Sequence, residues 1–315
     1  MSFDIIDPAD WDDEERKIQA RRMAMYSIAA ITAAKEVTRK YVIFPQLKGV
    51  LAAFDRIYQL SRQLDLPQGV LVSGPPGSSK STVAKYFMKS LPPAADVVDG
   101  FGAIYMRMRP GASAGFIVSQ VLKGLHHPFT NVRQDRVAPM RDIACEGLEH
   151  KGTRVLFIDE AQCLAHRGKR MAEERDTTAA NLLRELADTV GVGIVLLADQ
   201  RLQSLDQLDP GLADRLSGTL PLKHFEDGSI WAAFLGEFAR TVKAVSLAVL
   251  TEDKVCAATH AATKGGRRAF IRLISEAVLI AVDDNASAVT VSHLRLAFER
   301  TTGSGQIAPN PYGSE

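Results

Sequence analysis

Four short apolar runs alternate with amphipathic segments through the middle of the chain. The runs occupy residues 70–73, 103–108, 154–159 and 193–199. Segments of helical period follow them, at residues 80–91, 113–125, 139–150 and 178–190. Apolar strands that alternate with helices are typical of a parallel sheet covered on both faces. The pattern therefore predicts an α/β fold.

The two ends of the chain read differently from the middle. Residues 14–40 contain neither Gly nor Pro and predict one or two helices, whereas four further helical segments follow residue 229. The last fifteen residues are polar and contain Gly and Pro, which favours a flexible tail. We therefore expect four parts: an N-terminal helical extension (1–46), an α/β nucleotide-binding domain (47–228), a small helical lid domain (229–300) and the tail (301–315).

Composition narrows the class of protein. Hydrophobic residues make up 46% and charged residues 24% of the 315, as in an ordinary soluble globular protein. The 38 basic and 37 acidic residues give a net charge of +1, so any affinity for nucleic acid must come from a local basic patch. Three scattered cysteines, an acidic start unlike a signal peptide and the lack of a membrane-length apolar run predict a cytoplasmic protein with no membrane partner.

A phosphate-binding loop stands between the first predicted strand and its helix. Its candidate residues are Gly74, Pro75, Pro76, Gly77, Ser78, Ser79, Lys80, Ser81 and Thr82. Backbone N–H groups at such a turn surround phosphate oxygens, the lysine contacts the β- and γ-phosphates, and the Ser81 hydroxyl binds Mg²⁺. The pattern has glycine before the lysine, and this chain has Ser79. A Cβ there would weaken nucleotide affinity if the backbone needs a positive φ.

Two carboxylates end the third predicted strand, where open α/β sheets bind their ligands. Asp159 can support Mg²⁺, and Glu160 can orient or deprotonate the attacking water. Because this pair follows a phosphate loop in the expected order, the sequence predicts an ATP and Mg²⁺ site.

With these motifs in place, residues 47–300 resemble an AAA+ ATPase. The resemblance implies a P-loop sheet followed by a helical lid, and a sensor at the tip of GIVLLAD, which is Asp199 or Gln200. In LADRLSGTLPL it implies that Arg215 acts on the ATP of a neighbouring copy, although a surface ion pair with a nearby carboxylate such as Asp214 is the alternative. In GGRRAF it implies a nucleotide-sensing arginine, with Arg268 preferred to Arg267.

Longer stretches, including IDEAQCL and LLRELADTVGVGIVLLADQRLQSL, resemble the transposition ATPases, namely the phage Mu B protein, TniB and TnsC. This resemblance implies an ATP-dependent homo-oligomer, a ring or a helical filament, that binds duplex DNA. It also implies that the oligomer recruits or activates a transposase and works with a target-site selection protein.

Two basic segments are candidates for DNA contact. Arg107 and Arg109 lie at the end of the second predicted strand, and Lys169 and Arg170 follow the carboxylate pair. The sequence has no zinc finger and no clear helix-turn-helix, so we expect contacts to the DNA backbone rather than base readout.

The same motifs leave three other functions open. A protein-remodelling AAA+ machine would need an aromatic pore loop, and Tyr105 is placed by strand alternation on a sheet face. A nucleotide-switched scaffold without turnover is favoured by Ser79 and Asp199. A replication initiator or helicase loader shares the motifs, and only its binding partners would distinguish it.

Overall fold

The structure is a computed structural model that describes residues 17, 26–91, 102–165, 177–302 and 309–313. The chain divides into two compact units. The larger unit is Ile43–His224, and the smaller one joins Met1–Val42 to Phe225–Glu315. Among the described helices, none is both long enough and apolar enough to cross a bilayer.

A parallel five-stranded sheet forms the centre of the described part of the larger unit, in the order β2-β3-β4-β1-β5. The strands are β1 Gly69–Ser73, β2 Ala103–Arg107, β3 Val155–Asp159, β4 Gly193–Ala198 and β5 Thr219–Pro221. The four predicted strands are confirmed to within one residue at each end. The edge strand β5 was not expected, because it is three residues long and ends in proline.

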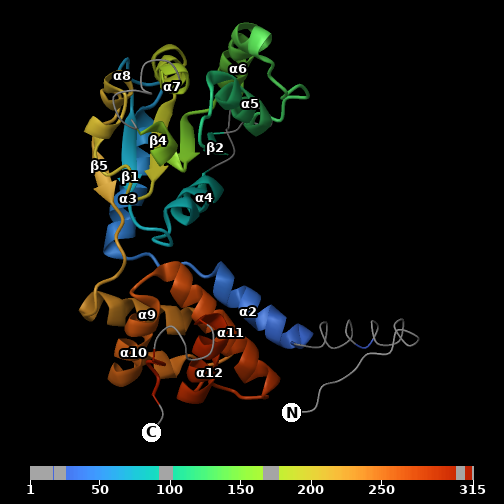
Figure 1. Ribbon diagram of the computed structural model, residues 1–315, viewed down its shortest axis with the longest axis vertical. Helices are drawn as coiled ribbons and strands as arrows, with labels where there is room; N and C mark the ends of the chain where they lie inside the picture. The colour runs from blue at the N-terminus through green and yellow to red at the C-terminus, as the bar shows by residue number, and fades with distance from the viewer. Residues whose placement is uncertain (1–16, 18–25, 92–101, 166–176, 303–308, 314–315) are drawn as a thin grey trace. The chain divides into compact units, whose positions relative to one another are not determined.

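Helices cover both faces of this sheet, as predicted. They are α3 Pro45–Leu60, α4 Lys80–Ser90, α5 Ala114–Gly124, α6 Val137–His150, α7 Thr177–Thr189 and the short α8 Pro210–Ala213, with 3₁₀ turns η2 Gln134–Arg136, η3 Ala161–Leu164 and η4 Leu205–Gln207. Helices α3 and α4 lie on one face, and α5 and α7 lie on the other (Figure 1). The fold class is therefore α/β.

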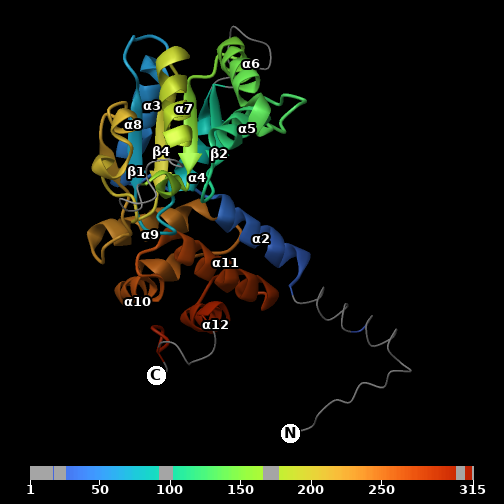
Figure 2. The same cartoon turned by 45° about the horizontal axis from the view of Figure 1, so that its top comes forward.

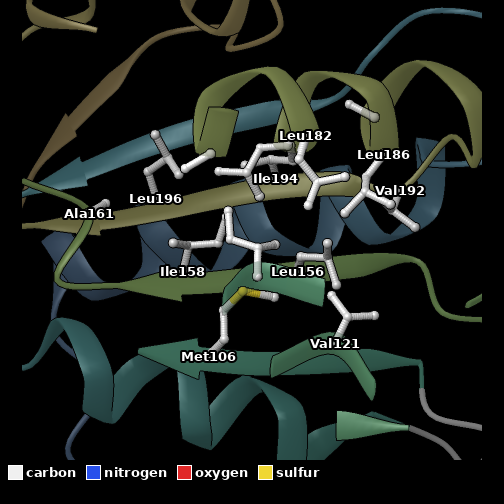
Figure 3. Close-up of a cluster of buried hydrophobic side chains, with 14 of the residues drawn as sticks. Met106, Val121, Leu156, Ile158, Ala161, Leu182, Leu186, Val192, Ile194 and Leu196 are labelled. Atoms are coloured by element: carbon white, nitrogen blue, oxygen red, sulfur yellow. The ribbon is translucent and has the colours of Figure 1, made fainter. Parts of the chain in front are cut away.

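Strand β3 is buried along its whole length, which fixes the position of its carboxyl end. Its residues Leu156 and Ile158 point toward the side of α5 and α7, where they join a close-packed apolar cluster (Figure 3). The intervening Phe157 points to the opposite face, with ring centroids 5.0 Å from Phe54 of α3 and 5.8 Å from Phe87 of α4. Side chains that alternate between two dry layers hold the strand rigidly.

The smaller unit is helical throughout its described elements. They are α2 Ile28–Arg39, α9 Ser229–Thr241, the 3₁₀ turn η5 Ala248–Thr251, α10 Asp253–Thr263, α11 Arg267–Asp283 and α12 Val291–Thr302. Figure 2 shows α2 lying along α11, which also packs against α12. Stacked and edge-on aromatic rings form its core around the fully buried Trp231, whose indole Nε1 donates to the Cys256 carbonyl at 3.1 Å.

The boundaries of the two units differ from the four expected parts. The helix α2, expected in a separate extension, groups with the C-terminal helices because one of its faces is buried, Ala30 and Val37 completely. In the expected tail, residues 309–313 are ordered against the unit: Tyr312 is buried, and its hydroxyl donates to Thr259 Oγ1 at 3.0 Å. Residues 303–308 and 314–315 of that tail lie outside the described residues.

Candidate nucleotide site

The phosphate loop has the backbone of a tight strand-to-helix turn. A Cβ on Gly74 would lie 2.1 Å from the Leu222 carbonyl oxygen, so only glycine fits there. Gly77 has a φ of +84°, and Ser79, the residue before helix α4, has a φ of +83°. Ser79 therefore has the positive φ at which a Cβ is expected to weaken nucleotide affinity. This left-handed conformation is the one that glycine tolerates best.

Lys80 lies inside this turn. Its Nζ donates to the carbonyl oxygens of Gly74 at 2.7 Å and Pro75 at 3.0 Å, and lies 3.4 Å from Ser78 Oγ. Because the side chain is almost fully buried, the ammonium charge stays at the centre of the loop. A buried cation ringed by backbone is suited to phosphate oxygens, which would exchange for the carbonyl contacts.

Ser81 and Asp159, the two side chains expected at a magnesium site, are in contact. The Ser81 hydroxyl donates to Asp159 Oδ2 at 2.7 Å. Tyr105 of β2 donates its hydroxyl to the same oxygen, and burial, followed by the hydrogen bond to Asp159, raises the pKa of this phenol. A serine hydroxyl and a carboxylate are hard oxygen ligands of the kind that Mg²⁺ prefers. The residues present therefore fit a magnesium ion.

Glu160 is held by two donors. Its backbone is left-handed, with a φ of +58°. Its Oε1 accepts from Arg107 Nη2 at 2.8 Å, and its Oε2 accepts from Gln162 Nε2 at 2.5 Å. Arg107, which we expected only as a DNA contact, reaches Glu160 because β2 pairs with β3 in a register that sets it beside Asp159. The arginine side chain remains 69% exposed.

The carboxylate of Asp199, expected at the sensor position, is neutralised. Arg201 donates Nε to Asp199 Oδ2 at 2.9 Å and Nη2 to the same oxygen at 2.6 Å. This contact lowers the pKa of Asp199. The backbone N–H of Asp199 donates to Gln162 Oε1 at 3.1 Å, so Gln162 connects the ends of β3 and β4. An acidic residue can therefore stand near the phosphates without an uncompensated charge.

Arg215 lies at the other edge of the sheet. Ser217 N donates to the Gly69 carbonyl at 2.8 Å, which places this segment where β1 begins, whereas the phosphate loop follows the end of β1. The guanidinium pairs with Asp188, with Nε to Oδ1 at 3.0 Å and Nη2 to Oδ2 at 2.8 Å. The expected alternative partner, Asp214, is 3.8 Å away, so Asp188 is the main one.

The remaining candidates are spread over other parts of the chain. Arg268 is exposed in the first turn of α11, whereas Arg267 is buried over the ring of Tyr41 and donates to the Lys40 carbonyl at 3.0 Å. Arg109 lies 4.5 Å from the centre of the Phe116 ring. Lys169 and Arg170 lie outside the described residues. Of Arg267 and Arg268, the second is the one whose side chain is exposed.

Comparisons with known proteins agree on the type of fold. The solved structures include ORC2 of Aeropyrum pernix in ADPNP–ADP complexes, with a TM-score of 0.60 and 16% identity over 86% of this chain and 72% of that one. The ORC1 protein of the same organism in complex with DNA has a TM-score of 0.61 and 17% identity, covering 85% of this chain and 69% of that one. At these identities the likeness shows the fold, which is that of AAA+ proteins.

Two sequence relationships were also found. The ATP-dependent zinc metalloprotease FtsH of Ureaplasma parvum is 29% identical over 295 residues, which cover 91% of this chain and 34% of the protease. The chain thus spans about a third of that relative's length. The model of the family described as "Bacterial TniB protein" matches residues 33–226, which is more than half of the chain. The chain belongs to the TniB family.

Proposed function

We propose that the chain binds ATP with Mg²⁺ and hydrolyses it to ADP and phosphate. The hydrogen bond between Ser81 and Asp159 carries this proposal, since it joins the two expected metal ligands beside the buried Lys80. A bound Mg²⁺ would neutralise charge that develops on the β- and γ-phosphates. Lys80 contacts the same phosphates, and the backbone N–H groups at the start of α4 surround them.

Glu160 is the general base in this proposal. Glu160 orients the attacking water and accepts a proton from it. To do so, Glu160 must first lose one of its two hydrogen bonds, from Arg107 or from Gln162. A base that must first be released favours slow turnover until the site is fully assembled. Asp199, with its charge held by Arg201, or the adjacent Gln200 supplies the polar group at the sensor position.

Hydrolysis takes place between copies of the chain. Arg215 lies at the opposite end of β1 from the phosphate loop, about 16 Å away for five strand residues. An arginine side chain cannot cover that span, so Arg215 acts on the nucleotide of a neighbouring copy, where it stabilises negative charge on the γ-phosphate. Arg268 of the helical unit is the further nucleotide contact that we propose.

The work done with ATP is transposition. Membership of the TniB family supports an oligomer that assembles on duplex DNA, recruits or activates a transposase and cooperates with a target-site selection protein. Arg107, Arg109, Lys169 and Arg170 are the proposed phosphate contacts. The alternative of an initiator or helicase loader is distinguished by its partner, because it would bind a replicative helicase rather than a transposase.

The test is ATP turnover by the wild type and by two variants. Lys80→Ala should lose nucleotide binding, and Glu160→Gln should keep it while hydrolysis falls at least about a hundredfold, as expected when a general base is removed. A fluorescent ATP analogue measures binding, and phosphate release measures turnover. Equal hydrolysis by the wild type and Glu160→Gln would refute the role of Glu160. Nucleotide binding without any wild-type turnover would favour a nucleotide-switched scaffold.

A further inference from the structure

The edge of the sheet opposite the nucleotide site contains a groove of about 520 Å³. One side of it is the segment between α3 and β1, with Leu64 and Leu66 exposed by 45% and 68%. The other side is the end of α7 and the residues that follow it, including Asp188. The groove and the Arg215–Asp188 pair thus share a residue and form one continuous surface.

We infer that this surface receives the nucleotide edge of a second copy of the chain, and that Asp188 holds Arg215 ready there until the neighbour's γ-phosphate replaces it. The inference rests on the proposed hydrolysis between copies. It adds a positioning residue, Asp188, and the groove beside it, neither of which the sequence motifs include.

Hydrogen bonds fix the side chain of Arg215, yet a phosphate can still replace Asp188 as its partner. All three guanidinium nitrogens are engaged, because Nη1 donates to the Gly211 carbonyl at 2.7 Å while Nε and Nη2 bind the two oxygens of Asp188. The side chain of Arg215 is 23% exposed and that of Asp188 is 37% exposed, so the pair is accessible to a ligand. Arginine forms the same two-pronged contact with a phosphate, which carries more negative charge than a carboxylate.

The second copy is the occupant that this geometry favours. An arginine fixed at this edge cannot reach the phosphates of its own chain, and a phosphate of another copy is the anion that would draw it away from Asp188. Exposed leucines on the far side of the groove supply apolar area at the same contact. Binding of the neighbour therefore buries Leu64 and Leu66 and delivers the competing charge in one step.

The test measures ATP hydrolysis per protomer against protein concentration. Asp188→Asn keeps the size of the side chain and removes its charge, so at low concentration its rate should exceed the wild-type rate about fivefold, the size expected of one partly exposed ion pair. Asp214→Asn is the matched control and should behave as the wild type, because Asp214 is 86% exposed and 3.8 Å from Arg215. Leu66→Ser should require a severalfold higher concentration for half-maximal activity.

Two further variants separate positioning from mere support of the fold. Asp188→Glu should return the wild-type concentration dependence, and Asp188→Asn should have no effect in an Arg215→Ala background. A lower rate for Asp188→Asn at every concentration, with unchanged thermal unfolding, would overturn the inference. Wild-type hydrolysis that does not depend on concentration would overturn it while leaving the ATP site intact. A lack of wild-type hydrolysis would instead refute the proposed function.

Discussion

Ser79 has a backbone conformation that costs free energy, and replacing it by glycine should recover that cost. Its φ of +83° and ψ of 11° lie in the left-handed region, which costs a residue with a Cβ about 1–2 kcal/mol. Glycine loses about 0.4–1 kcal/mol more backbone entropy on folding than a residue with a Cβ. Ser79→Gly should therefore range from neutral to about 1.6 kcal/mol more stable than the wild type.

A comparison with the preceding residue isolates the strain. Ser78 is buried like Ser79 but has no positive φ. The change from Ala to Gly alters only the Cβ, so we would measure it at both positions in variants that already lack the hydroxyl. The entropy loss of glycine is the same at both positions. The difference between the two Ala→Gly changes in the free energy of unfolding should therefore equal the strain at residue 79, about 1–2 kcal/mol.

The assays are urea unfolding without nucleotide and the affinity for a fluorescent ATP analogue. If the Cβ of Ser79 also crowds the phosphates, Ser79→Gly should bind ATP more tightly. Ser78→Gly should not, because it only removes the hydroxyl that lies 3.4 Å from Lys80 Nζ. Equal losses of stability for Ala→Gly at the two positions would refute the reasoning, since they would mean that the left-handed backbone at residue 79 costs nothing.

Three other predictions follow from contacts of the described residues. Arg107→Ala should release Glu160 and raise hydrolysis without DNA about two- to fivefold, the range for an exposed ion pair, and an unchanged or lower rate in the phosphate-release assay would contradict this. Arg201→Ala should raise the pKa of Asp199 toward its ordinary value, because the side-chain contact is lost while the backbone N–H of residue 201 still donates to Asp199. By NMR, the Asp199 carboxylate of the variant should then gain its proton at a higher pH than that of the wild type. Tyr312→Phe should lower the free energy of unfolding by about 1 kcal/mol in urea, because Thr259 loses a buried hydrogen bond; an unchanged value would show that this hydrogen bond adds no stability.

The sequence was most informative where local pattern decides the structure. Apolar runs located β1 to β4 within one residue at each end, because a strand buried on both faces has to be apolar throughout. Edge strand β5 has no such run, since its residues are at most partly buried. The meeting of Ser81 and Asp159 was also predictable, because the carboxyl ends of parallel strands share one edge of the sheet.

The partners of the charged side chains were not predictable, because they depend on which strands are neighbours. Tyr105 and Arg107 reach Asp159 and Glu160 only because β2 lies beside β3 in the sheet. In the chain, helices α5 and α6 separate these two strands. The pair between Arg215 and a residue 27 positions earlier likewise depends on how α7 packs. Strand alternation indicates the face on which a side chain lies, but it carries no information about the neighbouring strand.

DNA binding at increasing salt tests the central claim, ATP-dependent assembly on duplex DNA, most directly. Filter binding of random-sequence duplex would be measured with ATP, ADP or no nucleotide, for the wild type and for Lys80→Ala. The account predicts that the wild type binds DNA tightly with ATP but not with ADP or without nucleotide. The affinity should fall steeply with salt, as phosphate contacts are screened, and depend little on DNA sequence. Lys80→Ala should bind weakly under every condition. Wild-type binding that is the same with and without ATP, or insensitive to salt, would contradict the account.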